Sequence, residues 1–220
     1  MANFYDASYK ILIADDHLVV QQGMRAIIRD FLPKASISLA SSLDEALQLL
    51  QCEGADLLIL DINIPGGNSF QMIDQVREVR SGTRILLFSA YDERVYGLRY
   101  LKTGIDGYLQ KSSSEKETRH AIMKVLTEGR YISSQVQDLL LDNYPHSGVN
   151  RLSTLSNREL EIARLMINGE RTSGIADKLE LKLSTVSTYK NRIFEKLNVS
   201  NISELIEEFR LDLQQAGSPE

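Results

Sequence analysis

The sequence contains one cysteine, no tryptophan and four prolines among its 220 residues. The lone Cys52 excludes an internal disulfide, and the three histidines are too scattered to form a zinc site with it. No apolar run reaches the roughly 18 residues that a membrane-spanning helix needs. Residues 1–10 lack the charged start and apolar stretch of a signal peptide. We therefore expect a cytoplasmic protein without membrane contact, in which Cys52 packs from a helix against the core.

Basic residues are also in the minority. The net charge is -5, with 25 Lys and Arg against 30 Asp and Glu. Residues 1–150 hold 15 basic and 19 acidic side chains, whereas residues 182–198 hold four basic side chains and one acidic. Binding to nucleic-acid phosphates requires a local basic patch and not a basic chain. The charge balance therefore leaves DNA binding open for the second half of the sequence.

The first half alternates between short apolar runs and stretches of helical period. We predict strands at residues 10–14, 37–40, 56–60, 84–88 and 107–109, and helices at 17–31, 43–51, 69–80, 93–102 and 115–128. Ser42, followed three residues later by Glu45, predicts a capping box at the second helix. Strands that alternate with helices indicate a parallel sheet covered by helices on both faces.

The pattern changes after residue 134, because no β-rich run follows. Residues 142–150 are polar, contain Pro145 and Gly148, and indicate a linker. Helical patterns follow at residues 157–168, 173–179, 184–197 and 202–213. The 220 residues therefore suffice for two domains, an α/β domain and a helical one.

Polar side chains follow four of the five predicted strands: Asp15, Asp16, Asp61, Asn63, Ser89 and Lys111. The carboxyl ends of parallel strands meet at one edge of a sheet, where ligands bind. Clustered carboxylates repel one another unless a cation joins them, and Mg²⁺ prefers such oxygen ligands. A carboxylate can attack phosphorus, and an ammonium offsets charge on the transferring oxygens. Taken alone, each residue has a structural alternative; Ser89, for example, could cap the next turn.

These residues resemble the receiver domain of response regulators. The segments around Asp15-Asp16-His17, Asp61 to Gly66 and Gly107 to Lys111 are similar to the NarL/FixJ branch, over about residues 10–130. The resemblance implies a five-stranded, doubly wound, flavodoxin-like sheet of order 2-1-3-4-5. It also implies Asp61 as the phospho-acceptor and Mg²⁺ as the cofactor. The implied metal ligands are Asp15, Asp16, Asp61 and the main-chain carbonyl of Asn63; the implied switch residues are Ser89, Lys111 and the aromatic Tyr108. Gln110 and Ser112 depart from the family pattern.

The second domain has the layout of a helix-turn-helix, with a short helix, a turn at residues 180–183 and a longer helix. In the longer helix Val186, Ile193 and Leu197 share one face, which we expect to be buried. Short polar side chains on the other face could reach base edges: Ser184, Ser187, Thr188 and Asn191. Others suit phosphate contact: Lys182, Thr185, Lys190, Arg192 and Lys196. The alternative is a polar face that only meets water, in a helical unit that docks proteins.

Residues 152–208 resemble the LuxR-type helix-turn-helix, through Leu155 to Leu165, Gly169, Ile175, Ala176, Leu179, Thr185, Val186, Lys196, Leu197 and Val199. The resemblance implies that Ile202, Leu205 and Ile206 pair two DNA-bound copies and that Glu159 is structural. Gly174, Glu180 and Lys182 depart from the family pattern. Lys182 cannot accept hydrogen bonds from free helix N–H groups, so we expect Ser184 to cap a helix that starts later.

These features together predict a phosphorylation-controlled DNA-binding transcriptional regulator. We expect a receiver at residues 1–132, a linker at 133–151, a LuxR-type helix-turn-helix domain at 152–213 and a tail at 214–220. The expected partners are a sensor histidine kinase, promoter half-sites in double-stranded DNA and a second copy after phosphorylation, with RNA polymerase a further candidate. The protein would not be an enzyme beyond transferring and hydrolysing its own phosphoryl group.

Two other functions compete with this interpretation. One is a phosphatase or phosphotransferase of the aspartyl-phosphate type, which the separate helical domain disfavours. The other is a regulator whose first domain senses a small molecule, which would require an apolar, aromatic-rich cavity.

Overall fold

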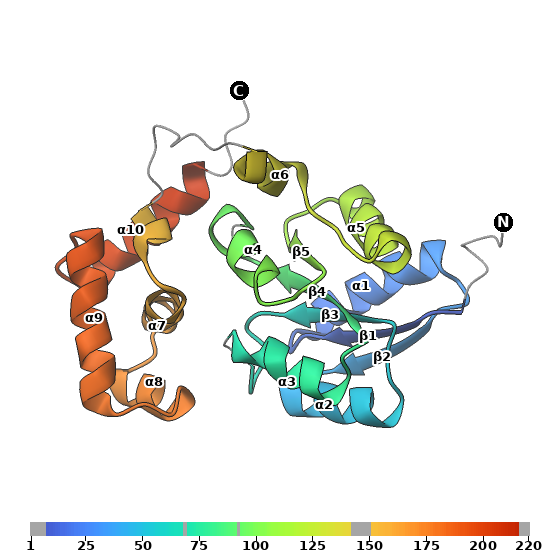
Figure 1. Ribbon diagram of the computed structural model, residues 1–220, viewed down its shortest axis with the longest axis horizontal. Coiled ribbons are helices and arrows are strands. Elements are labelled where there is room, and N and C mark those ends of the chain that lie inside the picture. Colours follow the sequence, from blue (N-terminus) through green and yellow to red (C-terminus); the bar gives the residue numbers. More distant parts are fainter. Residues whose placement is uncertain (1–7, 68–69, 92, 142–150, 216–220) are drawn as a thin grey trace. The chain divides into compact units, whose positions relative to one another are not determined.

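The structure, a computed structural model, describes residues 8–67, 70–91, 93–141 and 151–215 (Figure 1). The chain divides into two compact units, Met1–Leu141 and Asp142–Glu220. Residues 142–150 of the expected linker and 216–220 of the expected tail lie outside the described residues. The helices of the described part include none that is long and apolar enough to cross a membrane.

The first unit is built on a sheet of five parallel strands in the order β2-β1-β3-β4-β5, the order that the resemblance to receiver domains implied. The strands are β1 (Lys10–Ala14), β2 (Ser36–Ala40), β3 (Leu57–Asp61), β4 (Arg84–Ser89) and β5 (Gly107–Gln110). All five residues of β3 are buried, because this strand is central and covered on both faces. The sheet order places β3 directly beside β1 and β4, which positions the residues at their carboxyl ends.

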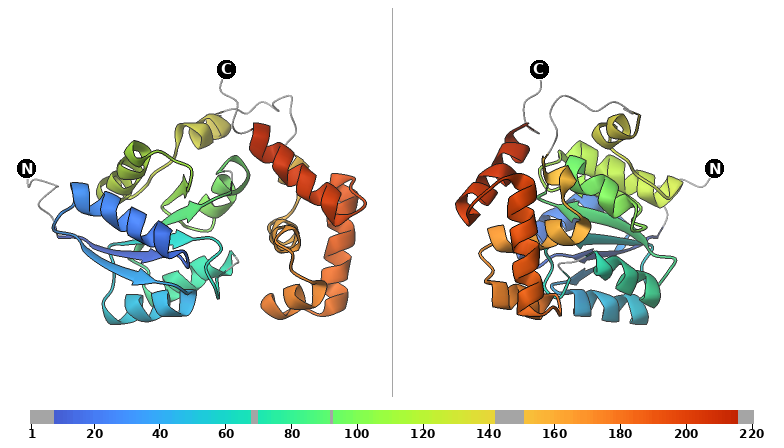
Figure 2. Two further views of the ribbon diagram at one scale, coloured as in Figure 1. Left: turned by 180° about the vertical axis from the view of Figure 1, so that it is seen from behind. Right: turned by 60° about the vertical axis from the view of Figure 1, so that its left-hand side comes forward.

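Helices cover both faces of the sheet (Figures 1 and 2). They are α1 (Leu18–Phe31), α2 (Leu43–Cys52), α3 (Gln71–Val79), α4 (Glu93–Leu101) and α5 (Glu115–Glu128). Helices α1 and α5 share one face, where Met24, Ile28, Ile122 and Val125 belong to one buried cluster. Helices α2 and α3 lie on the opposite face. Each predicted helix is present, with ends that differ by one or two residues from the sequence pattern.

A sixth helix, α6 (Ser134–Leu141), lies in the stretch that we expected to be a linker. Its Val136 is 1% exposed and packs against α4 at Gly97, where an added Cβ would lie 3.2 Å from the Val136 methyl. The absence of a side chain at Gly97 therefore lets the two helices approach closely. Helix α6 belongs to the first unit, so the helical part of residues 133–151 is not a free connection.

Two local predictions in the first unit need correction. Cys52 is the last residue of α2 and is exposed, so it does not pack against the core. Ser42 accepts a hydrogen bond from the Glu45 N–H, as predicted, but the Glu45 carboxylate accepts from the N–H of Ser41. In a capping box the Glu45 carboxylate would accept from the N–H of Ser42, the N-cap residue, so this hydrogen bond is displaced by one residue.

Within residues 151–215, the described part of the second unit, the chain forms a 3-10 helix at Arg151–Thr154 and four α-helices. These are α7 (Asn157–Ile167), α8 (Thr172–Lys178), α9 (Leu183–Leu197) and α10 (Ile202–Gln215). Ser156 and Glu159 form a complete capping box at the start of α7. The predicted buried face of α9 is confirmed, because Val186, Ile193 and Leu197 are each 0% exposed.

The turn between α8 and α9 departs from the LuxR-type pattern that this sequence resembles. Glu180 adopts a left-handed backbone conformation with φ 51°, in the turn where the family pattern has glycine. Helix α9 begins at Leu183 with Lys182 as an N-cap that offers no side-chain hydrogen bond. The expectation that Ser184 caps a later start is therefore wrong. A non-glycine residue in this conformation costs roughly 1–2 kcal/mol, because its Cβ crowds the backbone.

We predict that Glu180→Gly raises the free energy of unfolding of the second unit by about 1 kcal/mol, because it removes the crowded Cβ. Glu180→Ala is the matched control, since it removes the carboxylate and keeps the Cβ. Hydrogen exchange of α8 and α9 amides in the full chain measures the effect. Equal protection in the glycine and alanine variants would show that the backbone conformation is not the source.

Candidate functional site

The predicted site residues lie at the carboxyl ends of β1, β3, β4 and β5. Asp15 follows β1, Asp61 and Ser89 end β3 and β4, and Lys111 follows β5. The side chains of Asp15 and Asp61 are 2% and 3% exposed, so both carboxylates are held away from water. The Lys111 ammonium lies 2.6 Å from Asp15 Oδ2 and 3.2 Å from Asp61 Oδ2. The structure therefore brings together three residues separated by up to 96 positions.

The charges at this edge are unbalanced. Burial raises the pKa of Asp61, and the nearby Asp15 carboxylate raises it further. Lys111 and the Asn63 backbone N–H oppose this shift without cancelling it. Burial alone would lower the pKa of Lys111, but its contacts with Asp15 and Asp61 outweigh burial and raise it. Lys111 therefore stays charged, and its single ammonium is the counter-charge of two buried carboxylates.

Asp16 and His17 complete the cluster on its exposed side. The His17 Nδ1 atom lies 2.8 Å from Asp16 Oδ1 and 3.2 Å from Asp15 Oδ1, while the His17 backbone N–H donates to Asp15. One ligand atom from each of Asp15, Asp16, His17 and Asp61 lies within 4.8 Å of the others. Oxygen ligands at this spacing, with excess negative charge, can hold a metal ion. His17 was not among the predicted site residues, although its position next to Asp16 in the sequence pointed to this cluster.

Ser89 and Tyr108 both form hydrogen bonds with Tyr91, which was not among the predicted site residues. The Ser89 hydroxyl is buried and accepts a hydrogen bond from the Tyr91 N–H at 3.1 Å. The Tyr108 hydroxyl donates to the Tyr91 carbonyl at 2.9 Å, and the Gln110 amide donates to it at 3.3 Å. The Tyr91 hydroxyl lies 3.4 Å from the Asn63 side chain. Tyr91 therefore joins the loops after β3 and β4 to β5.

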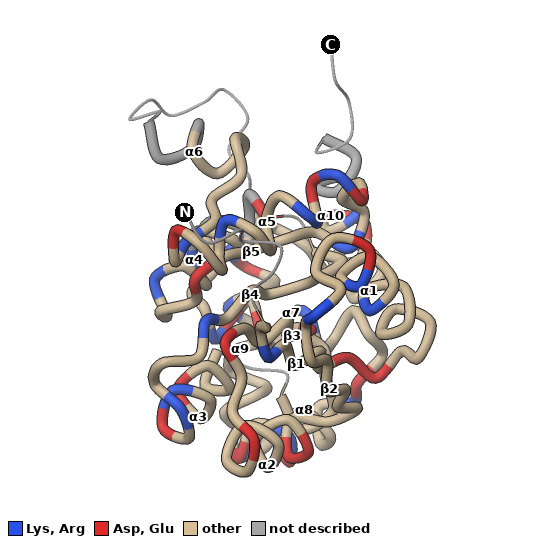
Figure 3. The backbone as a smooth tube through the Cα atoms, turned by 90° about the vertical axis from the view of Figure 1, so that its right-hand side faces the viewer, with Lys and Arg blue, Asp and Glu red and all other residues tan. Residues whose placement is uncertain are grey.

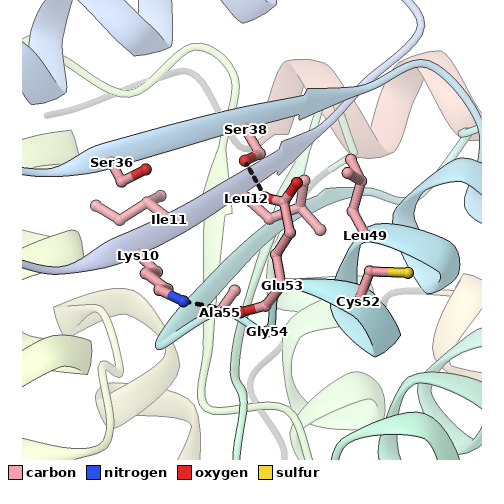
Figure 4. Close-up of a pocket in the computed structure, with 10 residues that line it drawn as sticks. All are labelled: Lys10, Ile11, Leu12, Ser36, Ser38, Leu49, Cys52, Glu53, Gly54 and Ala55. Carbon is pink, nitrogen blue, oxygen red and sulfur yellow. Dashed lines mark hydrogen bonds between the residues drawn. The ribbon is translucent and has the colours of Figure 1, made fainter.

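A separate cavity of about 320 Å³ lies between β1, β2 and α2 (Figure 4). Lys10 and Ser36 begin their strands, so this cavity is at the amino-terminal end of the sheet and not beside Asp61. Its lining includes Ser38, Cys52 and Glu53 and no aromatic residue. This composition does not suit the apolar, aromatic-rich ligand cavity that a small-molecule sensor would need.

The exposed face of α9 carries the candidate DNA contacts. The exposed members are Lys182, Ser184, Ser187, Thr188, Asn191, Arg192 and Lys196, whereas Thr185 and Lys190 are partly buried. The Ser187 and Thr188 hydroxyls donate to the carbonyls of Leu183 and Ser184 one turn earlier. Basic and acidic positions both occur along the whole backbone (Figure 3), whereas residues 182–198 hold four basic side chains and one acidic side chain. The segment that contains α9 is therefore polar with a small basic excess.

Two predicted contacts on this unit have other roles in the structure. The Lys196 ammonium lies 2.7 Å from the Glu159 carboxylate, whose side chain is 5% exposed. Lys196 therefore forms an ion pair with a buried residue of its own unit. Leu205, predicted to pair two copies, is 0% exposed and packs within its own unit. The prediction for Leu205 is therefore wrong, because a side chain buried in the core cannot also contact a partner. Ile202 and Ile206 are partly exposed.

Both units match models of known protein families. Residues 11–123 match the model of the response regulator receiver domain, and residues 153–209 match that of the bacterial regulatory proteins of the luxR family. This chain is a response regulator of the NarL/FixJ type. Its receiver and its LuxR-type domain correspond to the two halves recognised in the sequence.

Relatives of the regulator match it along nearly its whole length. Fimbriae Z protein of Escherichia coli (strain K12) is 26% identical over 204 residues, covering 91% of this chain and 96% of that protein. Response regulator GacA of Pseudomonas aeruginosa is 29% identical over 198 residues, covering 89% and 92%. RcsB of Salmonella enterica serovar Typhimurium, solved bound to the promoter rprA in the presence of phosphomimetic BeF3-, has a TM-score of 0.77 at 20% identity. That match covers 93% of this chain and 99% of RcsB, and it supports the fold.

We predict that Lys111→Met in the regulator lowers the free energy of unfolding by about 3 kcal/mol in metal-free buffer, because two buried carboxylates lose their counter-charge. Urea unfolding measures the loss. A divalent cation should restore part of it, and so should the added substitution Asp61→Asn. The exposed Lys116→Met is the control. An unchanged urea midpoint for Lys111→Met would contradict the charge balance described above.

The Glu159–Lys196 pair predicts a pH dependence of the LuxR-type domain. Burial raises the pKa of Glu159, but Lys196 and Ser156 outweigh it and leave the pKa lowered. A group with a lowered folded pKa stabilises the fold above its unfolded pKa and loses this effect as the pH falls through the folded value. Protection of α7 and α9 amides should therefore fall below about pH 4.5. Glu159→Gln should remove this acid-dependent loss, and the exposed Glu195→Gln should retain it.

Proposed function

We propose that Asp61 accepts a phosphoryl group from a sensor histidine kinase and that phosphorylation then enables the LuxR-type domain to bind promoter DNA as a homodimer. One observation carries the proposal: the Lys111 ammonium bridges two buried carboxylates at adjacent strand ends, at 2.6 and 3.2 Å. This arrangement provides a nucleophile, a counter-charge and a binding place for the transferred group at one edge of the sheet.

The chemistry is an in-line transfer. A carboxylate oxygen of Asp61 attacks the phosphorus of a phosphohistidine, a P–O bond forms, and the P–N bond breaks with its electron pair returning to the imidazole. Lys111 stabilises the negative charge on the phosphoryl oxygens after transfer. The acceptor is the regulator's own side chain, so the protein needs no site for an external substrate. We propose that loss of the phosphoryl group by hydrolysis occurs at the same place.

A Mg²⁺ ion fits the carboxylate oxygens of Asp15, Asp16 and Asp61, which cluster at this edge and carry excess negative charge. The residues that would hold it are Asp15, Asp16, Asp61 and the main-chain carbonyl of Asn63. When bound, the ion would neutralise charge on the carboxylates and on the transferring phosphoryl group. The buried and mutually repelling carboxylates of Asp15 and Asp61 supply the reason that a cation is favoured here.

Ser89 and Tyr108 would change conformation when Asp61 is phosphorylated. Both hydrogen bond to Tyr91, so a new bond from the Ser89 hydroxyl to the phosphoryl group would alter the loop that Tyr108 also holds. Tyr108 is 2% exposed, and a change in its rotamer would require repacking beside α4. This coupling supports the proposed switch roles of both residues.

The DNA-binding role rests on the exposed face of α9. Ser184, Ser187, Thr188 and Asn191 would contact base edges, while Lys182, Thr185, Lys190 and Arg192 would contact phosphates. Lys196 is the weakest candidate because its ammonium is already paired with Glu159. Structures of the similar RcsB include two dimers bound to two parallel DNAs. Ile202 and Ile206 are our candidates for pairing two copies, and RNA polymerase is a further candidate partner in the cytoplasm.

The test is intact-mass labelling of the full chain with acetyl phosphate and Mg²⁺. We expect the wild type to gain one phosphoryl group and Asp61→Asn to gain none, because the substitution removes the nucleophilic oxygen. Asp44→Asn is the control, since Asp44 is an exposed carboxylate on α2. Equal labelling of Asp61→Asn and wild type would show that the acceptor lies elsewhere. Turnover of an added phosphomonoester would instead indicate a phosphatase.

A further inference from the structure

Leu183 stands out on the surface of the second unit. It is the first residue of α9 and is 54% exposed, and it is the one large apolar side chain of comparable exposure among the described residues of that unit. The core-facing side of α9 is formed by Val186, Ile193 and Leu197, each 0% exposed. Leu183 therefore does not contribute to the core in the way that these three residues do.

The surroundings of Leu183 belong to the candidate DNA face. The Ser187 hydroxyl donates to the Leu183 carbonyl at 3.0 Å, which places Ser187 one turn along the helix. Lys182 and Ser184 flank it in the sequence and are both exposed. The first turn of α9 contains no acidic residue that would repel DNA phosphates. The exposed apolar side chain of Leu183 therefore lies at the start of a helix face that otherwise carries hydroxyl, amide and basic groups.

The position of Leu183 gives this exposure a physical meaning. In helix-turn-helix proteins the N-terminal residues of the second helix contact base edges in the major groove. The apolar group that the major groove presents is the C5-methyl of thymine. Burying about one methylene equivalent contributes on the order of 0.8 kcal/mol, or about fourfold in affinity. An exposed leucine at the start of α9 can make this apolar contact.

We propose that Leu183 packs on the C5-methyl group of a thymine and so selects thymine at one position of each DNA half-site. The inference rests on the proposed DNA-binding function and assigns part of its specificity to an apolar contact. The polar residues Ser187, Thr188 and Asn191 would read other positions by hydrogen bonding. A leucine exposed for no purpose, which is common on protein surfaces, is the competing explanation.

The experiment uses the full chain with Mg²⁺ and beryllofluoride. Its preferred site is first selected from random duplexes, and each thymine of the half-site is then replaced by uracil, which lacks only the methyl group. We expect replacement of the contacted thymine by uracil in one half-site to weaken wild-type binding about fourfold, measured by fluorescence anisotropy. Leu183→Ala removes the contact from both half-sites, so it should bind the thymine site about 15-fold more weakly and show no further loss with uracil.

Two variants separate this contact from general effects. Leu183→Met keeps an apolar side chain, so it should retain the dependence on the methyl group. Val79→Ala removes an exposed apolar side chain from the receiver, at 38% exposure, and should behave as wild type. Leu183 is exposed, so its substitution leaves the core packing intact.

The outcomes are distinct. An equal loss with uracil in wild type and Leu183→Ala would overturn the contact, and so would a half-site in which no uracil replacement weakens binding. Failure of the full chain to bind any selected DNA would overturn the proposed function, and the inference would fall with it. A methyl dependence that disappears only in Leu183→Ala supports both.

Discussion

The bridge from Lys111 to Asp15 and Asp61 is the interaction on which the first unit's chemistry depends. Two carboxylates buried at adjacent strand ends repel each other, and a single ammonium at 2.6 and 3.2 Å offsets only part of their charge. The remaining negative charge makes the site receptive to a cation. Burial, together with the nearby Asp15 carboxylate, raises the pKa of Asp61. Parallel strand order is the constraint that places these groups together.

Packing extends from this bridge to the end of the first unit. Ser89 and Tyr108 both bond to Tyr91, and the Tyr108 ring lies 3.9 Å from where a Cβ of Gly97 would be. Gly97 is also the residue of α4 against which Val136 of α6 packs. A side chain larger than hydrogen at position 97 would displace one of these neighbours. The Lys111–Asp61 edge of the sheet and helix α6 are thus connected through contiguous, closely packed groups.

The second unit tolerates departures from its family because its core is intact. Glu180 in a left-handed conformation and Lys182 at an uncapped helix start are both unfavourable locally. The buried faces of α7 and α9 and the Glu159–Lys196 pair hold the helices in place despite them. Local preference and tertiary packing conflict here, and packing prevails, as it often does over modest local terms.

The residue pattern was sufficient to predict the alternation of strands and helices, the parallel sheet, the residues at the strand ends and the buried face of α9. These follow from side-chain periodicity and chain order, which are local properties. Four other features became known only from the folded chain: Tyr91 links Ser89 to Tyr108, His17 joins the carboxylates, Lys196 pairs with Glu159, and Leu205 is buried. Each of these depends on which side chains meet across elements, and a linear pattern specifies a face of a helix but not the partner that packs on it.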